Sequence, residues 1–567
     1  MIRRRVLLRC DGGDLPEIGT GHVVRCLAMA HDLAELPGSA VAFCMRTGRE
    51  ALRVQAAGFE VFAIEAGQDP NTVLLEAAAE HDADVVALDD LGASAPAVAP
   101  LRAAGRVVVA IDDPQSPGAA DLSWTVAFPG VGATFEGLDR TVLLAPVAAP
   151  RSPRGVLASF GGFDPADLCG RFLRAWHDAG VERPCTIAVG AGHAHLDELQ
   201  ALAALTPGAR LVVGADLAAL LPDTGVALTN GGTTMLLCAA FGVPSLAVAQ
   251  YEHQLGMAQQ LQDAGAARAL GIASEVDFDA LVREALRLLD DEPRRIAMSS
   301  AGRRALPGFG RRDAVQTLTL VEELPWDSNF FGRRIATLHP RALSPRLLEL
   351  ALERCVEAEV ECLYFLCDAA REESLALARA EQFLEVDARL TYSLRTTDAG
   401  EPPPEGDVTL RPGRPADAAA LAAIAGDSYG ASRYFHDPNF PAERCRQFYR
   451  DWILRSLEGR FDDAVLVAEL DRQPVGYVSC RALTANLGSI GLVGIDAALR
   501  GRGLGKRLVH AALQWFAERD LPTVEVVTQG RNAPARKLYE STGFALHRRE
   551  VWFHKWFEPE PRRHDTN

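Results

Sequence analysis

The chain has 567 residues, of which 48% are hydrophobic and 23% are charged, a composition ordinary for a water-soluble globular protein of two or three domains. Its formal net charge of −17 argues against nucleic-acid binding, because a protein that binds a phosphate backbone normally presents a basic face. The expected partners are therefore small molecules.

The cysteines and the apolar runs indicate the cellular compartment of the protein. Eleven cysteines are scattered without a CxxC pair, which favours buried thiols in a reducing cytoplasm. No cluster of His, Cys and carboxylate residues has metal-ligand spacing, so no metal is expected. Residues 1–5 are basic, but too few apolar residues follow for a signal peptide, and no apolar run is long enough to span a bilayer. The sequence predicts a cytoplasmic protein without membrane insertion.

The first 320 residues alternate between short apolar runs and helix-like stretches. Residues 6–8 lead into a glycine-rich turn and a helix over 23–36, and a proline-containing linker is expected at 146–153. This alternation predicts two doubly wound α/β lobes, over 1–150 and 151–320, with the ligand site between them. The other predicted strands are 84–88, 107–111, 156–159, 187–189, 211–213, 226–229 and 245–249.

Two acidic pairs follow two of these strands. Asp89-Asp90 comes after the run at 84–88, and Asp112-Asp113 comes after the run at 107–111. Because parallel sheets bind ligands at the carboxyl ends of their strands, the four carboxylates are expected at the rim of a binding site.

The character of the sequence changes near Trp326. A smaller α/β segment is expected over 321–397, followed by a proline-rich acidic linker at 398–407 and a last α/β domain over 408–560. The elements predicted in that domain are a hairpin of 464–470 with 475–480, strands at 492–496 and 524–528, and a helix at 504–517.

A second glycine-rich turn, Arg500 to Lys506, joins the strand at 492–496 to the helix at 504–517. Backbone amides and the helix dipole at such a turn suit a pyrophosphate. The loop alone is also compatible with a plain strand-to-helix turn. The spacing Arg500-x-x-Gly503-x-Gly505, with Asn532 and the Leu-Tyr-x-x-x-Gly-Phe run at 538–544, resembles the GNAT acetyltransferase superfamily.

Three further motifs narrow this resemblance. Residues 326–332, 432–440 and 528–532 resemble the dTDP-fucosamine acetyltransferase branch, and the likeness covers about 321–557. Members of that branch acetylate the exocyclic amine of a nucleotide-linked 4-amino-4,6-dideoxy sugar from acetyl-CoA. The residues that the resemblance implies for acetyl-CoA are Ile495, Arg500, Arg502, Gly503, Leu504, Gly505, Lys506 and, at the pantetheine arm, Asn532.

The same resemblance implies that Tyr539 protonates the departing thiolate and that Arg433 binds the sugar substrate. A phenol near a developing thiolate is chemically suited to donate its proton. Tyr539 is also compatible with a buried aromatic in the last helix, and the 432–440 segment with a simple capped loop.

At the N-terminal loop, His22 lies beside Gly19 and Gly21 at a loop-to-helix junction. A neutral imidazole there can remove a proton from water near physiological pH. The alternative is a histidine that caps the helix. Asp11 and Arg25 favour the functional interpretation, because with His22 they form a polar cluster at the end of the first strand.

The motifs at 8–12, 18–27, 112–113, 159–164 and 230–234 resemble the UDP-sugar hydrolase of pseudaminic acid biosynthesis and its spore-coat-polysaccharide relatives. The likeness covers about 1–320. It implies a glycosyltransferase-B fold and cleavage between the anomeric carbon and the nucleoside diphosphate. His22 would activate water, Asp11 would orient the histidine or the sugar, and the 231–234 loop would meet the diphosphate. The implied substrate-binding residues are Gly19, Gly21, Arg25, Gly161, Gly162, Asn230, Gly231, Gly232, Thr233, Thr234 and Gln254.

The sequence departs from this second family at Leu237, where relatives typically place an acidic residue that holds the ribose hydroxyls. Leucine cannot accept a hydrogen bond. Three alternatives stay open: the nucleoside is held differently, it lacks a hydroxyl, or the lobe has lost hydrolase activity.

Together the two resemblances predict a bifunctional enzyme. It would N-acetylate an amino sugar carried on UDP or dTDP and hydrolyse the sugar from its nucleotide, in pseudaminic-acid-like or surface polysaccharide biosynthesis. One alternative is a glycosyltransferase fused to a sugar acetyltransferase. Another is a non-catalytic sugar-binding module that delivers substrate to the acetyltransferase.

Overall fold

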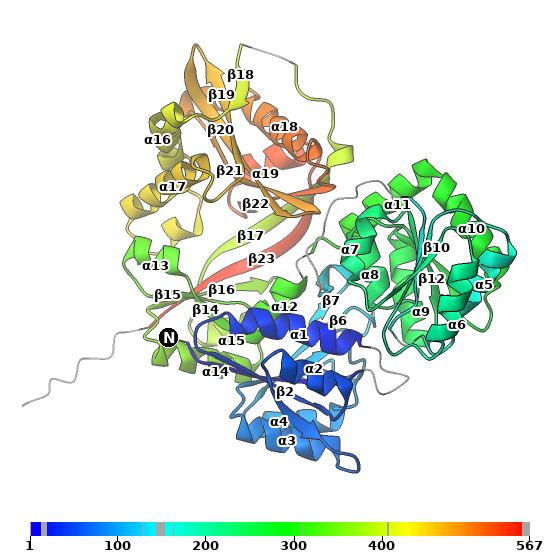
Figure 1. Cartoon of the computed structure of the whole chain (residues 1–567). Coiled ribbons are helices and arrows are strands. Elements are labelled where there is room, and N and C mark those ends of the chain that lie inside the picture. Colours follow the sequence, from blue (N-terminus) through cyan, green and yellow to red (C-terminus); the bar gives the residue numbers. More distant parts are fainter. Residues whose placement is uncertain are drawn as a thin grey trace, which may run out of the picture. The chain divides into compact units, whose positions relative to one another are not determined.

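The computed structural model describes residues 2–12, 20–128, 130–142, 154–162, 164–308, 310–404 and 407–557. The chain forms two compact units, essentially Arg3–Thr319 and Leu320–Asn567 (Figure 1). We call them unit 1 and unit 2. The predicted linker at 146–153 lies outside the described residues.

The first lobe of unit 1 is built on a parallel seven-stranded sheet of order β3-β2-β1-β4-β5-β6-β7. The order reverses between β1 and β4, and such a reversal is where doubly wound sheets bind their ligands. The strands are β1 (Arg4–Cys10), β2 (Ser39–Arg46), β3 (Glu60–Ile64), β4 (Val85–Asp89), β5 (Val107–Ile111), β6 (Leu122–Thr125) and β7 (Phe135–Glu136). The helices are α1 (Gly21–Ala34), α2 (Arg49–Ala56), α3 (Pro70–Glu80), η1 (Ala95–Ala97), α4 (Val98–Ala103) and η2 (Leu138–Arg140).

The second lobe repeats this plan with a parallel six-stranded sheet of order β10-β9-β8-β11-β12-β13, which reverses between β8 and β11. Its strands are β8 (Val156–Ser159), β9 (Cys185–Val189), β10 (Ala209–Val213), β11 (Val226–Thr229), β12 (Ser245–Ala249) and β13 (Ala267–Ile272). Its helices are α5 (Leu168–Asp178), α6 (Leu196–Leu205), α7 (Leu217–Leu220), η3 (Leu221–Asp223), α8 (Thr233–Ala240), α9 (Glu252–Asp263), α10 (Phe278–Asp290), α11 (Glu292–Ala305) and α12 (Gly310–Thr319).

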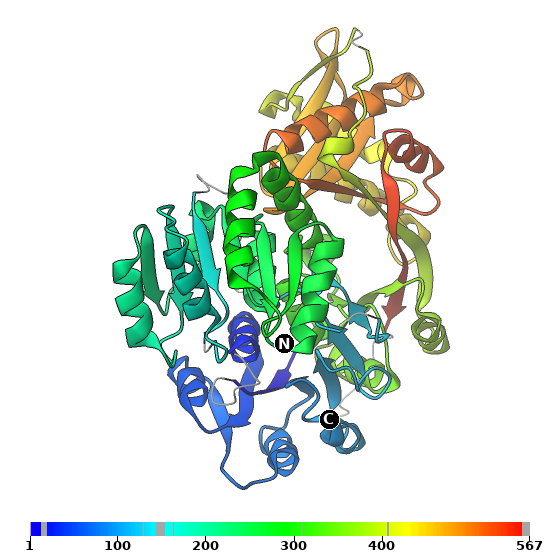
Figure 2. The same cartoon turned by 90° about the vertical axis from the view of Figure 1, so that its right-hand side faces the viewer.

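Helices cover both faces of this second sheet (Figure 2). Along β8, Val156 and Ala158 point into the core cluster that contains α5 and α10, whereas Leu157 points into the cluster that contains α8. A strand buried on both faces must be apolar at every position, and this is why these strands read as continuous apolar runs rather than as alternating ones. The predicted pair of doubly wound α/β lobes is confirmed.

Unit 2 contains one ten-stranded mixed sheet of order β14-β15-β16-β23-β17-β22-β21-β20-β19-β18. Its strands are β14 (Val321–Glu323), β15 (Ile335–Leu338), β16 (Cys362–Asp368), β17 (Leu384–Arg395), β18 (Thr409–Pro412), β19 (Ala464–Leu470), β20 (Gln473–Thr484), β21 (Leu487–Ile495), β22 (Thr523–Gln529) and β23 (Ala545–Trp556). Its helices are α13 (Pro325–Phe331), α14 (Pro345–Glu357), α15 (Glu372–Ala380), η4 (Thr396–Asp398), η5 (Pro415–Asp417), α16 (Ala418–Ser428), η6 (Arg433–His436), α17 (Ala442–Leu457), η7 (Ala497–Leu499), α18 (Leu504–Ala517) and α19 (Ala533–Glu540).

The segment expected at 321–397 shares this sheet with the last domain. It supplies β14 to β17, and β17 pairs antiparallel with both β22 and β23. The two long strands β17 and β23 run side by side through the middle of the unit (Figure 1). The predicted hairpin is confirmed as the antiparallel pair of β19 and β20.

This strand order predicts which fragments of unit 2 can fold on their own. A fragment of residues 320–567 should fold alone, because every pairing of its sheet lies within it. A fragment of 408–567 should aggregate, since it lacks β17, the strand between β22 and β23. Size-exclusion chromatography and thermal unfolding of both fragments are the measurement. A soluble, cooperatively unfolding 408–567 fragment would contradict the shared sheet.

Candidate active sites

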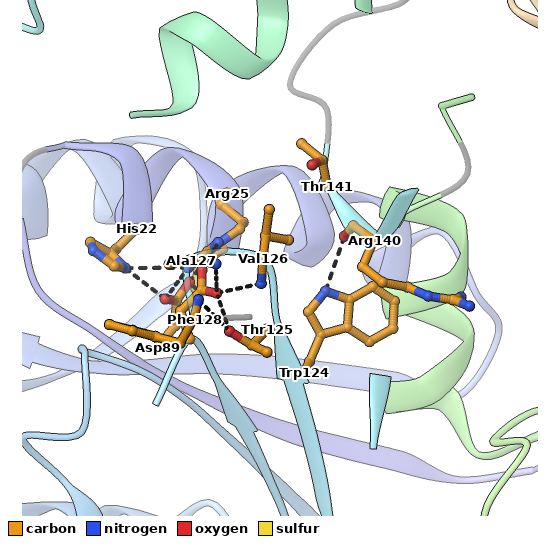
Figure 3. Close-up of polar contacts among 12 residues, drawn as sticks. His22, Arg25, Asp89, Trp124, Thr125, Val126, Ala127, Phe128, Arg140 and Thr141 are labelled. Carbon is orange, nitrogen blue, oxygen red and sulfur yellow. Dashed lines mark hydrogen bonds and ion pairs between the residues drawn. The ribbon is translucent and has the colours of Figure 1, made fainter. Parts of the chain in front are cut away.

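His22 lies in the first turn of α1. Its Nδ1 is 2.6 Å from Oδ1 of Asp89, the last residue of β4 (Figure 3). The two residues therefore meet at the point where the strand order reverses. A carboxylate only accepts hydrogen bonds, so the contact places the imidazole proton on Nδ1 and leaves Nε2 as the basic nitrogen.

Arg25 fixes the carboxylate of Asp89. Its Nε donates to Oδ2 of Asp89 at 2.8 Å, a second guanidinium nitrogen contacts Oδ1, and Nη1 donates to Asp112 at 2.6 Å. Burial alone would raise the pKa of Asp89, but the charges of Arg25 and His22 outweigh it and hold that pKa well below its usual range. Asp89 is therefore a buried anion that can stabilise an imidazolium at His22.

Asp112 anchors this network to the next strands. Its Oδ1 accepts hydrogen bonds from the backbone N–H groups of Val126 at 2.7 Å and Ala127 at 3.0 Å, and from the hydroxyl of Thr125 at 3.2 Å (Figure 3). The start of α1 is thus tied to the ends of β4, β5 and β6, which limits the freedom of His22.

Asp11 does not take the place beside the histidine that the family resemblance assigned to it. Its carboxylate accepts from Arg9 at 2.6 Å and from the backbone N–H of Arg46 at 2.8 Å. Arg9 is buried and needs a counter-charge, and Asp11 supplies it two residues further along the chain. Asp89 orients His22 instead. A contact of Asp11 with the sugar stays a prediction. Gly19, another predicted site residue, lies outside the described residues.

In the second lobe, Asn230 joins the two loops at the other strand reversal. Its Nδ2 donates to the carbonyl oxygen of Phe160 at 3.1 Å, and its Oδ1 accepts from the N–H of Gly232 at 3.2 Å. Gly161 has a φ of +98°, which favours glycine there. The structure therefore brings the predicted 161–162 and 230–232 segments together.

The two lobes meet where these loops end. A Cβ atom on Gly21 would lie 3.3 Å from the side chain of Thr233, and one on Gly162 would lie 3.8 Å from Oγ1 of Thr20. The N-termini of α1 and α8 are therefore neighbours. Neither helix has a side-chain hydrogen bond at its N-cap. The first backbone N–H groups of both helices, including those near Thr234, can therefore donate hydrogen bonds to an anion.

His253, near the start of α9, is a neighbour of His22 in this site. Its ring stacks on Tyr251 with centroids 5.8 Å apart. Burial, and then the charge of His22, lower the pKa of His253. Leu237, in contrast, is 7% exposed and packs in the core beneath α8, so a ribose contact would have to come from another residue.

In unit 2, the second glycine loop is open on one side. Gly501 and Gly503 have φ values of +78° and +81°, and a Cβ atom on either would meet nothing within 4 Å. Gly503 is the N-cap of α18 and provides no side-chain hydrogen bond, so the amides from Leu504 onward are available to an anion. Arg502 and Lys506 are exposed beside them.

Gly505 and Arg500 have packing roles in this loop. A Cβ on Gly505 would lie 3.1 Å from Leu538 and 3.3 Å from Ile495, so glycine keeps α18 close to α19 and β21. Arg500 donates to the carbonyl oxygen of Ile495 at 3.1 Å. Asn532 accepts from the N–H of Ala535 at 3.2 Å and caps α19, so only its Nδ2 is left for the predicted pantetheine contact.

The strands β21 and β22 separate next to this loop. They pair in parallel only from Leu487 to Ile490. On the other side of β21, Val478 pairs with Val493 but Cys480 pairs with Ile490, which marks a bulge at this point. The ends of β21 and β22 therefore diverge.

Tyr539 lies near Tyr429, which in turn contacts Tyr477. It is 4% exposed, and burial raises its pKa, so the phenol keeps its proton at neutral pH. The hydroxyls of Tyr429 and Tyr477 are 3.0 Å apart. Burial, Tyr477 and Tyr539 all raise the pKa of Tyr429, which makes Tyr539 an electrostatic neighbour of that pair. Sequence analysis missed Tyr429 and Tyr477, which carry no glycine or charge pattern.

Arg433 is fixed by aromatic rings. Its guanidinium lies 3.8 Å from the ring centroid of Trp552 and 4.2 Å from that of Tyr364, and it donates to the hydroxyl of Tyr434 at 2.9 Å.

Within the described ranges, no group of three or more His, Cys, Asp or Glu residues could hold a metal ion. Among the helices that the structure describes, none is long and apolar enough to cross a membrane.

Comparisons with known proteins decide the class of unit 2. The model of the acetyltransferase (GNAT) family matches residues 431–544. The chain is an enzyme with a GNAT acetyltransferase domain. Acetyltransferases of this family use acetyl-CoA, and the open glycine loop lies inside the matched range.

The dTDP-fucosamine acetyltransferase of Escherichia coli O6:H1 is 27% identical over 236 residues, which is 41% of this chain and 97% of that protein. The spore coat polysaccharide biosynthesis protein SpsG of Bacillus subtilis is 26% identical over 200 residues, or 34% of this chain. The alignment spans only 59% of SpsG. Among solved structures, MurG of Acinetobacter baumannii has 20% identity and a TM-score of 0.43, over 55% of this chain and 99% of MurG. The resemblances to the dTDP-fucosamine acetyltransferase branch and to the spore-coat-polysaccharide proteins are confirmed.

The packing of the second-lobe loop predicts a sharp effect of one methyl group. A Cβ on Gly231 would lie 1.9 Å from the backbone oxygen of Gln254, whose own side chain accepts from the N–H of Gln250. Gly231→Ala should therefore cost unit 1 at least about 1–3 kcal/mol in its free energy of unfolding. Gly162→Ala is the matched control, because its Cβ would make only ordinary contact. Denaturant unfolding of the two variants is the measurement, and equal stabilities would contradict the described packing.

Proposed function

We propose that the protein is a bifunctional enzyme of nucleotide-linked amino sugars. Unit 2 would transfer acetyl from acetyl-CoA to the amine of a 4-amino-4,6-dideoxy sugar carried on UDP or dTDP. Unit 1 would hydrolyse the sugar from its nucleoside diphosphate. The observation that carries the proposal is the buried pairing of His22 with Asp89 opposite the free N-terminus of α8, in one chain with a GNAT domain.

For acetyl transfer, the support is the match of 431–544 to GNAT acetyltransferases and the similarity to dTDP-fucosamine acetyltransferase. The loop from Arg500 to Lys506 would hold the pyrophosphate of acetyl-CoA with its amides and cations. The sugar amine attacks the thioester carbonyl and the C–S bond breaks. The thiolate takes the proton of Tyr539, whose raised pKa keeps it protonated beforehand, and the proton that the amine loses restores the phenol through solvent.

For hydrolysis, Nε2 of His22 would take a proton from water, and the hydroxide would form a bond to the anomeric carbon. The bond between that carbon and the diphosphate oxygen breaks, releasing the free sugar and the nucleoside diphosphate. The carboxylate of Asp89 stabilises the imidazolium that forms. The amides at the starts of α1 and α8, which are neighbours, would bind the leaving diphosphate.

The biological setting follows from these reactions and relatives. We assign the pair of steps to nonulosonic acid or surface polysaccharide biosynthesis, supported by the similarity to a spore coat polysaccharide biosynthesis protein. The eleven cysteines are all buried and unpaired, which fits reaction in the cytoplasm.

The hydrolytic assignment is tested by His22→Ala and Asp89→Asn. Each should lower the rate of nucleotide release about 10²–10⁴-fold, because one removes the base and the other its orienting anion, while acetyl transfer persists. Asp113→Asn is the control: it lies at the same sheet edge but accepts from the N–H of Gln115. Nucleotide release is followed by chromatography with and without added sugars. Release at the parent rate from His22→Ala would refute the role of His22, and release only when a second sugar is present would favour a glycosyltransferase.

The acetyl-transfer assignment is tested by Tyr539→Phe and Gly503→Val. Tyr539→Phe keeps the ring and deletes the proton donor, so kcat should fall about 10²–10⁴-fold at an unchanged KM for acetyl-CoA. Gly503→Val should mainly raise that KM, because a branched side chain at a positive φ distorts the anion-binding turn. Tyr392→Phe is the control, since the hydroxyl of Tyr392 donates to Glu540 at 2.8 Å. A Tyr539→Phe enzyme with full kcat would reduce the tyrosine to a packing role.

A further inference from the structure

Three arginines gather on one face of the sheet in unit 2. Arg389 in β17 is the register partner of Glu550 in β23, and Arg548 in β23 is the partner of Thr391 in β17. Side chains of paired residues, and of residues two apart on a strand, share a face. Arg389 and Arg548 therefore lie on the same side of the sheet. Arg433 comes from η6, which packs against β17.

Arg433 is held over this face with its charge intact. Its guanidinium stacks 3.8 Å from the ring centroid of Trp552, two residues beyond Glu550 on the same strand. Cation–π contacts of this kind fix the position of a guanidinium without neutralising it.

The positive charges on this face are only partly compensated: Asp327 acts on Arg433, and Glu525 and Glu550 act on Arg389. Among the described residues, the guanidinium of Arg389 makes no hydrogen bond, and its nearest carboxylate is that of Glu550 at 3.8 Å, which also contacts Arg341. No carboxylate of the described residues lies within salt-bridge distance of Arg548. Burial, then Arg548 and Arg433, lower the pKa of Arg389 to about 10, although Glu525 offsets part of this effect. Such repulsion is relieved when an anion binds.

The cluster is also close to the diverging ends of β21 and β22, next to the second glycine loop. Arg389 is the register partner of Gln529 in β22, and β22 is the strand that diverges from β21 beyond Val526. Adjacent strands are about 4.8 Å apart, so Arg389 lies one strand away from that divergence. The side chain of Arg389 is 27% exposed and can be reached by a ligand.

The acetyl-CoA loop belongs to the opposite face. Leu390 and Tyr392, the neighbours of Arg389 and Thr391 along β17, pack in the core that contains α18. Tyr364, against which Arg433 stacks, packs in the core that contains α17. The arginines are therefore separated from the N-terminus of α18 by the sheet itself, and the pyrophosphate of acetyl-CoA has its own site there.

We propose that Arg389, Arg433 and Arg548 bind the diphosphate of the nucleotide-linked acceptor and so make the acetyltransferase select sugars that carry a nucleotide. This inference rests on the proposed acetyl transfer to a nucleotide-linked amino sugar. A diphosphate would add negative charge where Arg389 and Arg548 repel each other, and it is joined to a sugar whose amine must reach the thioester of acetyl-CoA.

The test is steady-state acetylation by the full chain carrying Arg389→Gln, Arg548→Gln or both, with a nucleotide-linked amino sugar and with the same sugar lacking the nucleotide. Each single change should raise the KM for the nucleotide-linked acceptor about 10-fold, the usual cost of a lost charge-assisted hydrogen bond. The preference over the nucleotide-free sugar should fall accordingly. Arg549→Gln is the matched control, because Arg549 is the register partner of Leu390 and points to the other face.

Three outcomes overturn the proposal: an unchanged acceptor preference in the double variant, a raised KM for acetyl-CoA instead, or an equal effect of Arg549→Gln. A second measurement separates its failure from failure of the proposed function. Hydrogen exchange of the full chain with inorganic pyrophosphate should protect backbone amides of β17 and β23, and the double variant should lose that protection. Protection without any acetylation of amino sugars would reject the proposed substrate but keep the anion site, and no protection in the parent would reject the site.

Discussion

The carboxylate of Asp89 is the interaction on which the first site depends. It is fully buried, and a buried carboxylate is tolerated only when positive groups compensate its lost hydration. Arg25 and His22 supply that compensation from successive turns of one helix, α1. The same contacts that stabilise the anion therefore fix the imidazole and choose its tautomer. Structure and chemistry cannot be separated here, because removing the anion would leave Arg25 with only Asp112 and His22 without a defined orientation.

Much of the fold of unit 1 could be predicted from the sequence. The strands of unit 1 are apolar throughout because both faces of each sheet are covered, and the glycine loops mark where strands give way to helices. The acidic pairs at 89–90 and 112–113 were correctly expected at the carboxyl edge of the sheet. Which carboxylate meets His22 could not be predicted, because that depends on the neighbour of β1 in the sheet. Sequence proximity favoured Asp11, whereas strand order brings Asp89 from 67 residues away.

The architecture of unit 2 shows the same limit more strongly. The proline-rich stretch at 398–407 suggested a boundary between two domains, yet β17 before it pairs with β22 and β23 after it. Local composition records where the chain is free of regular structure, but it carries no information on which strands will pair across that gap. The arginine cluster was hidden for the same reason. Arg389 and Arg548 are 159 positions apart in number but one strand apart in the sheet.

The molecule has two kinds of candidate anion-binding site. At the starts of α1, α8 and α18, uncapped amides provide partial positive charge that needs no counter-ion, and the unliganded site is stable without rearrangement. The face with Arg389 and Arg548 uses full charges that repel one another until an anion arrives, which ties the stability of that face to occupancy. A site built from amides loses little stability when no ligand is bound, and it can bind any phosphate of suitable shape. A site built from guanidinium groups whose charge is only partly compensated discriminates by charge, because a neutral sugar leaves the repulsion in place.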